Sequence, residues 1–307
     1  MDKSIKLTVI GAGAWGTALS KLAAANGHQV TLWSRQSPLT LAEAIADREI
    51  IVSAISMKGV ALTAEQLKLL PLKPTAILVS ATKGLDPATS HTPSQIWQAA
   101  LPHHSVVVLS GPNPSAEIIA GLPAATVVAS TVPAAAQLVQ TVFASRNFRI
   151  YTNSDPLGVE LGGTLKNVIA IAVGVCDGLQ LGTNAKAGLI TRSLTEIIRV
   201  GIFFGAQPET FWGLSGLGDL LATCSSSLSR NYRVGYGLAQ GKNLTQVLSE
   251  IEGTAEGVNT TNVLIELADR EGITVPVSRY VYRLLHEEIT PQQAVEGLME
   301  RELKPEL

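Results

Sequence analysis

The sequence near the amino terminus reads Leu7-Thr-Val-Ile-Gly11-Ala-Gly13-Ala-Trp-Gly16, a short apolar run followed by three closely spaced glycines. The apolar run predicts a buried strand, and the segment Trp15–Asn26 behind it predicts a helix. Between a strand and a helix, the first glycine permits a tight turn, the second lets the backbone approach a pyrophosphate, and the third lets the helix pack closely. This stretch therefore predicts a βαβ unit that binds a dinucleotide, in preference to a glycine turn that binds nothing.

The chain around this unit divides into two parts. Up to about Arg149, β-branched runs alternate with alanine- and leucine-rich segments, which predicts a mostly parallel sheet covered by helices on both faces. From Asp155 onward, helical periodicity dominates and no strand is predicted. The expected strands are Leu7–Ile10, Gln29–Trp33, Ile50–Ala54, Ala76–Ser80, Val106–Leu109 and Ala125–Ala129.

The fold class expected from this pattern is α/β. A Rossmann-type, doubly wound, mostly parallel sheet forms a dinucleotide-binding domain over residues 1–153. An all-α domain over residues 154–307 is expected to carry the substrate and the catalytic groups.

Composition excludes several classes of function. The chain has a net charge of −2 without a long basic run, which disfavours nucleic-acid binding. The two cysteines, Cys176 and Cys224, lie far apart and in no CxxC pair, and Cys224 is interpreted as a small buried hydrophobe in preference to a reactive thiol. The histidines show no zinc spacing. The apolar stretch Val168–Cys176 is too short to cross a bilayer, so we expect a cytoplasmic protein without membrane insertion.

The end of the second predicted strand bears on cofactor preference. Folds that prefer NAD usually place a carboxylate there for the ribose hydroxyl, whereas this strand ends Leu32-Trp-Ser-Arg35. An arginine beside a hydroxyl suits a 2′-phosphate. We therefore expect NADPH to be preferred over NADH, with Arg35 as the determinant.

Two segments follow strand ends in the first domain. Lys83 follows the strand Ala76–Ser80, and Ser110-Gly-Pro-Asn113 follows the strand Val106–Leu109. Ligands bind at the carboxyl ends of such strands. Taken alone, Lys83 is equally compatible with a solvated surface lysine, and the second segment with an ordinary turn.

Lys166 is the most unusual residue of the second half, because it lies within a helix that is apolar on nearly every face. Such a helix should be buried. A buried ammonium is costly unless it is paired, and burial lowers its pKa toward the range useful for acid–base catalysis. The alternatives are a lysine that reaches the surface or one that pairs with a structural carboxylate such as Glu160.

The segment Leu214-Ser-Gly-Leu-Gly-Asp219-Leu-Leu-Ala-Thr-Cys224 is followed closely by Ser229-Arg230-Asn231. Arginine, serine and asparagine form a good set of donors for a phosphate. A capped helix start at Ser229 is the alternative on local grounds.

In this order and spacing, the motifs GAGAWGTAL, SATKGL, SGPNPSAEI, GVELGGTLKNVIAIAVG, NAKAGLITRSL, GLSGLGDLLATCSSSLSRN and AEGVNT resemble the bacterial-type NAD(P)-dependent glycerol-3-phosphate dehydrogenases. The resemblance covers almost the whole chain. It implies reversible reduction of dihydroxyacetone phosphate to sn-glycerol 3-phosphate, which supplies glycerophospholipid synthesis.

The resemblance also implies roles for individual residues. Lys166 is similar to the general acid/base of the family, Lys83 to the second lysine of the site, and Asp219 to the carboxylate that orients them. The implied substrate contacts are Lys83, Gly111, Asn113, Lys166, Asp219, Ser229, Arg230 and Asn231. The implied cofactor contacts are Gly11, Gly13, Ala14, Trp15, Gly16, Arg35, Lys83, Ser115, Arg230 and Glu256.

The chain departs from the family pattern at two places. The segment between Arg35 and the strand at Ile50 is shorter than usual, which leaves the adenosine side of the cofactor site less well defined. Pro114-Ser115 replaces an apolar residue and an alanine, and the small size at position 115 should be tolerated.

Other functions compatible with the residues are a ketopantoate-type or β-hydroxyacid reductase, which would act on a non-phosphorylated keto acid, and a cofactor-binding regulator without turnover. The helical half is also compatible with a homodimer.

Overall fold

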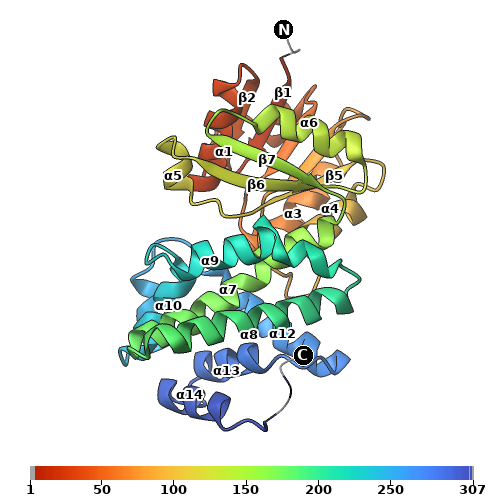
Figure 1. Cartoon of the computed structure of the whole chain (residues 1–307). Coiled ribbons are helices and arrows are strands. Elements are labelled where there is room, and N and C mark those ends of the chain that lie inside the picture. The colour runs from red at the N-terminus through yellow and green to blue at the C-terminus, as the bar shows by residue number, and fades with distance from the viewer. Residues whose placement is uncertain (1–3, 304, 306–307) are drawn as a thin grey trace.

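Seven strands form one sheet in the computed structural model, which describes residues 4–303 and 305 (Figure 1). The strands are β1 (Lys6–Ile10), β2 (Gln29–Trp33), β3 (Ile50–Ser53), β4 (Ile77–Ser80), β5 (Val106–Ser110), β6 (Ala124–Ala129) and β7 (Phe148–Asn153). Their order across the sheet is β2-β1-β3-β4-β5-β6-β7, and only the β5–β6 pairing is antiparallel. The predicted mostly parallel sheet is confirmed, with β7 as a strand that the sequence analysis missed.

Helices cover both faces of this sheet, as its sequence pattern predicts. One face carries α1 (Ala14–Ala25), α5 (Ser115–Ile119) and α6 (Pro133–Phe143). The other carries α2 (Leu41–Ile45), α3 (Met57–Lys68) and α4 (Pro93–Ala100). Alternate residues of β3 supply the two cores, since Ile50 and Val52 pack on the first face and Ile51 packs on the second. Buried on both faces, the sheet leaves mainly the ends of its strands for ligands.

Helices alone follow β7 among the described residues. They are α7 (Pro156–Gly178), α8 (Gly182–Phe203), η1 (Pro208–Trp212), η2 (Leu214–Gly218), α9 (Asp219–Cys224), α10 (Arg230–Ala239), α11 (Leu244–Ser249), α12 (Glu256–Glu271), α13 (Pro276–Leu285) and α14 (Pro291–Met299). Figure 1 shows α7 running through the middle of this half, below the sheet, with α8 and α10 beside it. The predicted all-α second half is confirmed.

Glycines allow α7 and α10 to touch backbone to backbone. A Cβ on Gly174 would lie 2.1 Å from the carbonyl oxygen of Tyr232, and one on Gly235 would lie 1.8 Å from that of Ile171. A larger side chain at either position would force the two helices apart. The close contact fixes the position of α10 relative to α7.

By length and composition, α7 could cross a membrane, so the expectation that the longest apolar stretch is too short was wrong. The helix has 23 residues, and its best 18-residue window has a mean hydropathy of 1.5. The sequence analysis counted only the uninterrupted apolar run from Val168 and stopped at the polar residues before it. Because 94% of the window is buried inside the protein, α7 is the core helix of the second domain.

Two buried glutamates cap helices other than their own. Glu196 of α8 accepts hydrogen bonds at the amino end of α13, from the backbone N–H groups of Val277 (2.8 Å) and Ser278 (2.9 Å) and from the Ser278 hydroxyl (2.5 Å). Glu160 of α7 accepts in the same way from Ser94 at the amino end of α4, and from the hydroxyl of Ser80 at 2.9 Å. Burial raises the pKa of both carboxyls, and these donors partly offset the rise. Glu160 thereby ties α7 to the sheet.

Candidate active site between the sheet and the helical domain

The glycine turn before α1 has the geometry that its sequence predicts. Gly11 has φ of 114°, and a Cβ there would lie 2.4 Å from the carbonyl oxygen of Ala54. A Cβ on Gly16 would lie 1.8 Å from the carbonyl oxygen of Gly11, so the third glycine is required for close packing. By contrast, no atom lies within 4 Å of a Cβ built on Gly13. The second glycine therefore faces open space, which a ligand can approach.

The amino end of α1 meets this open space. The helix begins at Ala14, is not capped by a side chain, and has no acidic residue in its first turn. Its first N–H groups and its dipole therefore favour an anion there. Trp15 packs its ring against the core of the sheet. These residues fit the diphosphate of a dinucleotide.

Arg35 lies exposed just beyond β2, in a turn held by serines. The backbone N–H of Ser34 donates to the Ser37 hydroxyl at 2.9 Å, and the Ser34 hydroxyl accepts from the N–H of Gln36 at 3.3 Å. The short segment between this turn and β3 folds into α2, whose amino end is capped by Thr40. The segment is therefore ordered, and Arg35 stands at the edge of the sheet, three strands from β4.

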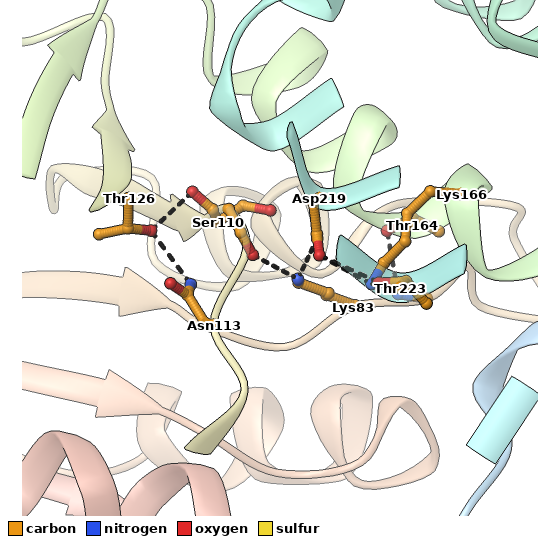
Figure 2. Close-up of polar contacts among 10 residues, drawn as sticks. Lys83, Ser110, Asn113, Thr126, Thr164, Lys166, Asp219 and Thr223 are labelled. Atoms are coloured by element: carbon orange, nitrogen blue, oxygen red, sulfur yellow. Dashed lines mark hydrogen bonds and ion pairs between the residues drawn. The ribbon is translucent and has the colours of Figure 1, made fainter. Parts of the chain in front are cut away.

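A lysine–aspartate–lysine cluster occupies the junction of the two halves (Figure 2). Asp219 accepts from Lys83 through Oδ2 at 2.5 Å and from Lys166 through Oδ1 at 2.9 Å. Lys166 also donates to the hydroxyl of Thr223. The Lys166 and Asp219 side chains are 8% and 3% exposed, so neither the surface lysine nor a pairing with Glu160 is correct. The structure thus brings together the three residues predicted as catalytic.

Three separate elements position this cluster. Lys83 follows β4, Lys166 lies in the middle of α7, and Asp219 begins α9 directly after η2, a single turn of π-helix. A Cβ on Gly162 would lie 2.9 Å from the carbonyl oxygen of Ser215, so this glycine lets η2 approach α7. Thr223 follows Asp219 by one helical turn and shares its face. The sequence analysis gave Thr223 no role, although this spacing was a usable signal.

Burial and charge act on the cluster in opposite directions. Burial lowers the pKa of Lys166 to about 8; the neighbouring charge of Lys83 also lowers it, while Asp219 raises it. Burial alone would raise the pKa of Asp219, but the ammonium groups of Lys166 and Lys83 hold it below its usual range. At neutral pH the cluster therefore contains a carboxylate and an ammonium that can release its proton readily.

The neighbouring cysteine remains a thiol. Cys224 is completely buried, and burial raises its pKa to about 12. Cys176 is also buried, and burial raises its pKa as well. The interpretation of Cys224 as a small buried hydrophobe is confirmed.

The loop after β5 reaches the same cluster. The carbonyl oxygen of Gly111 accepts from Lys83 at 3.2 Å. Asn113 donates from Nδ2 to the hydroxyl of Thr126 at 3.0 Å, and this hydroxyl donates to the carbonyl oxygen of Ser110 at 2.9 Å. Figure 2 shows this chain of contacts beside Lys83. Ser115 lies just beyond it, as the first residue of α5.

The start of α10 carries the predicted phosphate donors. Ser229 caps the helix by accepting from the N–H of Tyr232 at 3.3 Å, so the local capping interpretation is correct. Asn231 is 8% exposed and accepts from the N–H of Gly257 through Oδ1 at 2.9 Å. This contact fixes the amide, because a backbone N–H cannot accept, and it directs Nδ2 away from Gly257.

Glu256 links this region to the first domain, with Arg230 near it. Arg230 is exposed and donates from Nη1 to the carbonyl oxygen of Thr254 at 3.0 Å. Burial raises the pKa of Glu256. A hydrogen bond from the backbone N–H of Met57 and the positive charges of Arg230 and Lys58 oppose this rise. Met57 and Lys58 begin α3 of the sheet domain. Glu256 of the helical half therefore reaches the edge of the predicted dinucleotide site.

Comparisons with known proteins agree along the whole chain. Residues 6–40 and 36–136 match the family described as the NAD-dependent glycerol-3-phosphate dehydrogenase N-terminus, and residues 155–296 match its C-terminus. A protein of Synechocystis sp. named glycerol-3-phosphate dehydrogenase [NAD(P)+] is 64% identical over 305 residues, which are 99% of this chain and 96% of that protein.

Solved structures give the same result. A crystal structure of glycerol-3-phosphate dehydrogenase from Coxiella burnetii is 34% identical with a TM-score of 0.92, over 97% of this chain and 99% of that one. A putative ketopantoate reductase from Ralstonia solanacearum is 15% identical with a TM-score of 0.58, over 95% of this chain and 99% of that one, which shows a related fold only.

Proposed function

This chain belongs to the NAD-dependent glycerol-3-phosphate dehydrogenase family, and from that premise we propose how its residues divide the reaction. The protein is an NAD(P)-dependent oxidoreductase that converts dihydroxyacetone phosphate to sn-glycerol 3-phosphate, reversibly. This activity supplies the glycerol phosphate of glycerophospholipids. The ketopantoate-type alternative is not favoured.

The dinucleotide is held by the turn before α1 and by residues on both sides of the domain junction. Gly11, Gly13, Ala14, Trp15 and Gly16 receive the diphosphate, because Gly13 faces open space beside an uncapped helix start. Lys83, Ser115, Arg230 and Glu256 are the residues nearer the domain junction that would contact the cofactor. The bound cofactor supplies a hydride to the carbonyl carbon of the substrate.

Arg35 makes NADPH the preferred cofactor. Its exposed guanidinium at the end of β2 would pair with the 2′-phosphate, and Ser34 lies beside it in the same turn. NADH, which lacks this phosphate, binds without the contact and is used less well.

The substrate lies between the start of α10 and the lysine cluster. Ser229, Arg230 and Asn231 bind its phosphate, and the fixed amide of Asn231 presents Nδ2 as a donor. Gly111 and Asn113 form the wall on the side of β5, where Gly111 also positions Lys83. The ketone oxygen then lies at the cluster.

Lys166 is the general acid of the reduction. Its ammonium donates a proton to the ketone oxygen as the carbonyl becomes an alcohol, and solvent restores the proton afterwards. Lys83 adds positive potential where the oxygen gains negative charge, and Asp219 holds both lysines in place. In the reverse direction the neutral amine of Lys166 accepts the proton.

One observation carries this proposal: the buried contact of Lys166 and Lys83 with a single carboxylate, at the junction that faces the dinucleotide turn. Asp47 also pairs with two lysines, Lys6 and Lys73, but at the exposed surface. The burial of Lys166 and Asp219 is what distinguishes the cluster at the domain junction. The pKa of about 8 for Lys166 places its proton transfer near neutral pH.

We place the boundary between the domains after residue 153, where the sheet ends. We place the protein in the cytoplasm, where free thiols such as those of Cys176 and Cys224 persist. A homodimer through the helical half is supported by exposed apolar side chains there, including those of Ile202, Phe203 and Trp212.

The test is oxidation of NADPH by the purified protein with and without dihydroxyacetone phosphate. Turnover is expected only when the phosphorylated ketone is present. Dihydroxyacetone without the phosphate serves as the control for the role of α10, and ketopantoate tests the alternative. Turnover with ketopantoate and none with dihydroxyacetone phosphate would refute the assignment.

A further inference from the structure

A second lysine–carboxylate pair lies where α7 passes into α8, and the proposed function gives it no role. Lys186, in the motif Asn184-Ala-Lys-Ala187, donates from Nζ to Oδ2 of Asp177 at 2.6 Å. The hydroxyl of Tyr232 donates to the same Oδ2 at 2.8 Å. One carboxylate oxygen therefore joins the end of α7, the start of α8 and the first turn of α10.

Lys186 also contacts the ring of Tyr232. Its Nζ lies 5.9 Å from the ring centroid, within the range of a cation–π interaction. The side chains of Lys186 and Asp177 are 28% and 27% exposed, so water screens this pair less than it screens a surface ion pair. Burial and the neighbouring Asp177 raise the pKa of Tyr232 to about 12, which keeps its hydroxyl protonated as a donor.

Tyr232 is fixed at three points as a result. Its hydroxyl is held by Asp177, its N–H donates to the hydroxyl of Ser229, and its carbonyl oxygen lies against Gly174 of α7. Arg230 and Asn231 lie between Ser229 and Tyr232 in the chain. The turn that presents the phosphate donors is thus fixed relative to α7.

The same helix carries Lys166. The distance from the phosphate donors to the general acid is therefore set by how α10 is held on α7 and α8. A small shift of this turn would move Arg230 and Asn231 away from the phosphate of a substrate whose ketone lies at Lys166, so the substrate would bind less tightly.

Resting on the proposed function, we infer that Asp177 and Lys186 are positioning residues for the phosphate end of the substrate. They act through Tyr232, which holds Arg230 and Asn231 at the required place. Neither Asp177 nor Lys186 contacts the substrate in this proposal. The inference gives a role to Lys186 of the Asn184–Ala187 motif, which takes no part in cofactor binding or in the catalytic cluster.

The experiment compares three variants with a matched control. Asp177→Asn and Lys186→Met break the pair, and Tyr232→Phe removes only the hydroxyl. Lys242→Met is the control, because Lys242 lies just beyond the carboxyl end of α10, is exposed, and pairs at 2.7 Å with Glu250 at the end of α11. The readouts are KM for dihydroxyacetone phosphate, kcat, and protection against thermal unfolding by inorganic phosphate.

We expect Asp177→Asn and Lys186→Met to raise KM for dihydroxyacetone phosphate about tenfold, with kcat changed less than KM, as for lost substrate binding. Tyr232→Phe should raise KM by about threefold, because the ring and its packing remain. Phosphate should protect both pair variants less than the wild type. Lys186→Arg should restore most of the binding, because a guanidinium can also donate to Asp177.

The outcomes separate this inference from the proposed function. A wild type without turnover on dihydroxyacetone phosphate would contradict the proposed function. An active wild type, with pair variants that lose thermal stability but keep KM and phosphate protection, would overturn the positioning role. An equal rise of KM in Lys242→Met would also overturn it, because general packing of α10 would then explain the effect.

Discussion

Asp219 and Glu196 are both carboxylates buried in the helical domain, yet their surroundings give them opposite chemistry. Two ammonium groups hold the pKa of Asp219 below its usual range, despite a burial that would raise it. Among the described residues no ammonium group contacts Glu196; burial raises its pKa, and the Ser278 hydroxyl, the backbone N–H groups of α13 and the charge of Arg199 offset only part of the rise. A buried acid paired with lysines forms a site for proton transfer, whereas one paired with a helix end holds helices together.

The first prediction tests the catalytic side of this comparison and has the largest expected effect. Lys166→Ala should lower kcat for reduction by about 10²–10⁴, the usual range for a lost general acid. Thermal stability should change little, because Asp219 keeps its contact with Lys83. Steady-state kinetics and thermal unfolding provide the measurement. A kcat near that of the wild type would show that the cluster is structural.

The second prediction tests the structural side. Glu196→Gln should lower the free energy of unfolding by about 1–3 kcal/mol, because an amide places a donor against the N–H groups of α13. The values of kcat and KM should not change. Chemical denaturation is the measurement, and Glu266→Gln on the exposed face of α12 is the control. A large loss of kcat in a folded Glu196→Gln protein would remove the distinction between the two carboxylates.

The third prediction concerns the pH dependence of the cluster. The reduction needs the ammonium of Lys166, so kcat should fall as pH rises through about 8, by about tenfold for each further unit. Oxidation of sn-glycerol 3-phosphate needs the neutral amine, so it should rise over the same range. Asp219→Asn should move both profiles to lower pH, since it removes the charge that raises this pKa. If the pH profiles of Asp219→Asn match those of the wild type, the charge of Asp219 does not raise the pKa of Lys166.

The fourth prediction extends the comparison from buried charges to an exposed one, that of Arg35, and has the smallest expected effect. Arg35 is exposed, so its pairing with a 2′-phosphate is screened. Arg35→Ala should lower the ratio of kcat/KM for NADPH over NADH by roughly three- to fivefold, the scale of an exposed ion pair. If the wild type prefers NADH, Arg35 is not the residue that determines cofactor selectivity.

Local pattern was sufficient for most of the fold. The glycine turn, six strands and the helical second half follow from runs and periods of a few residues. The strand β7 is an edge strand whose burial alternates regularly, with Phe148 and Ile150 buried and Arg149 and Tyr151 exposed, so its alternation was a usable signal that the sequence analysis missed. The reversal of direction between β5 and β6 depends on contacts far apart in the chain, which no local window contains.

The residues of the site could be predicted from the sequence, but the contacts between them could not. Glu160 was considered as a partner for Lys166, but six residues along a helix turn through about 600°, which places the two on different faces. The true partner, Asp219, lies 53 positions away in sequence. Only the packing of η2 against α7 brings them together, so the resemblance to a family supplied what composition and spacing could not.

The length of α7 has a consequence for how the chain is made. The helices that cover it within the second domain, α8 to α14, all follow it in sequence, so α7 leaves the ribosome before these helices exist. At that moment it is an apolar segment long enough for the machinery that inserts proteins into membranes. Lys166, in the middle of the helix, makes insertion cost about 2.5–3.5 kcal/mol more. The residue proposed to deliver the proton also directs the newly made chain toward folding in water.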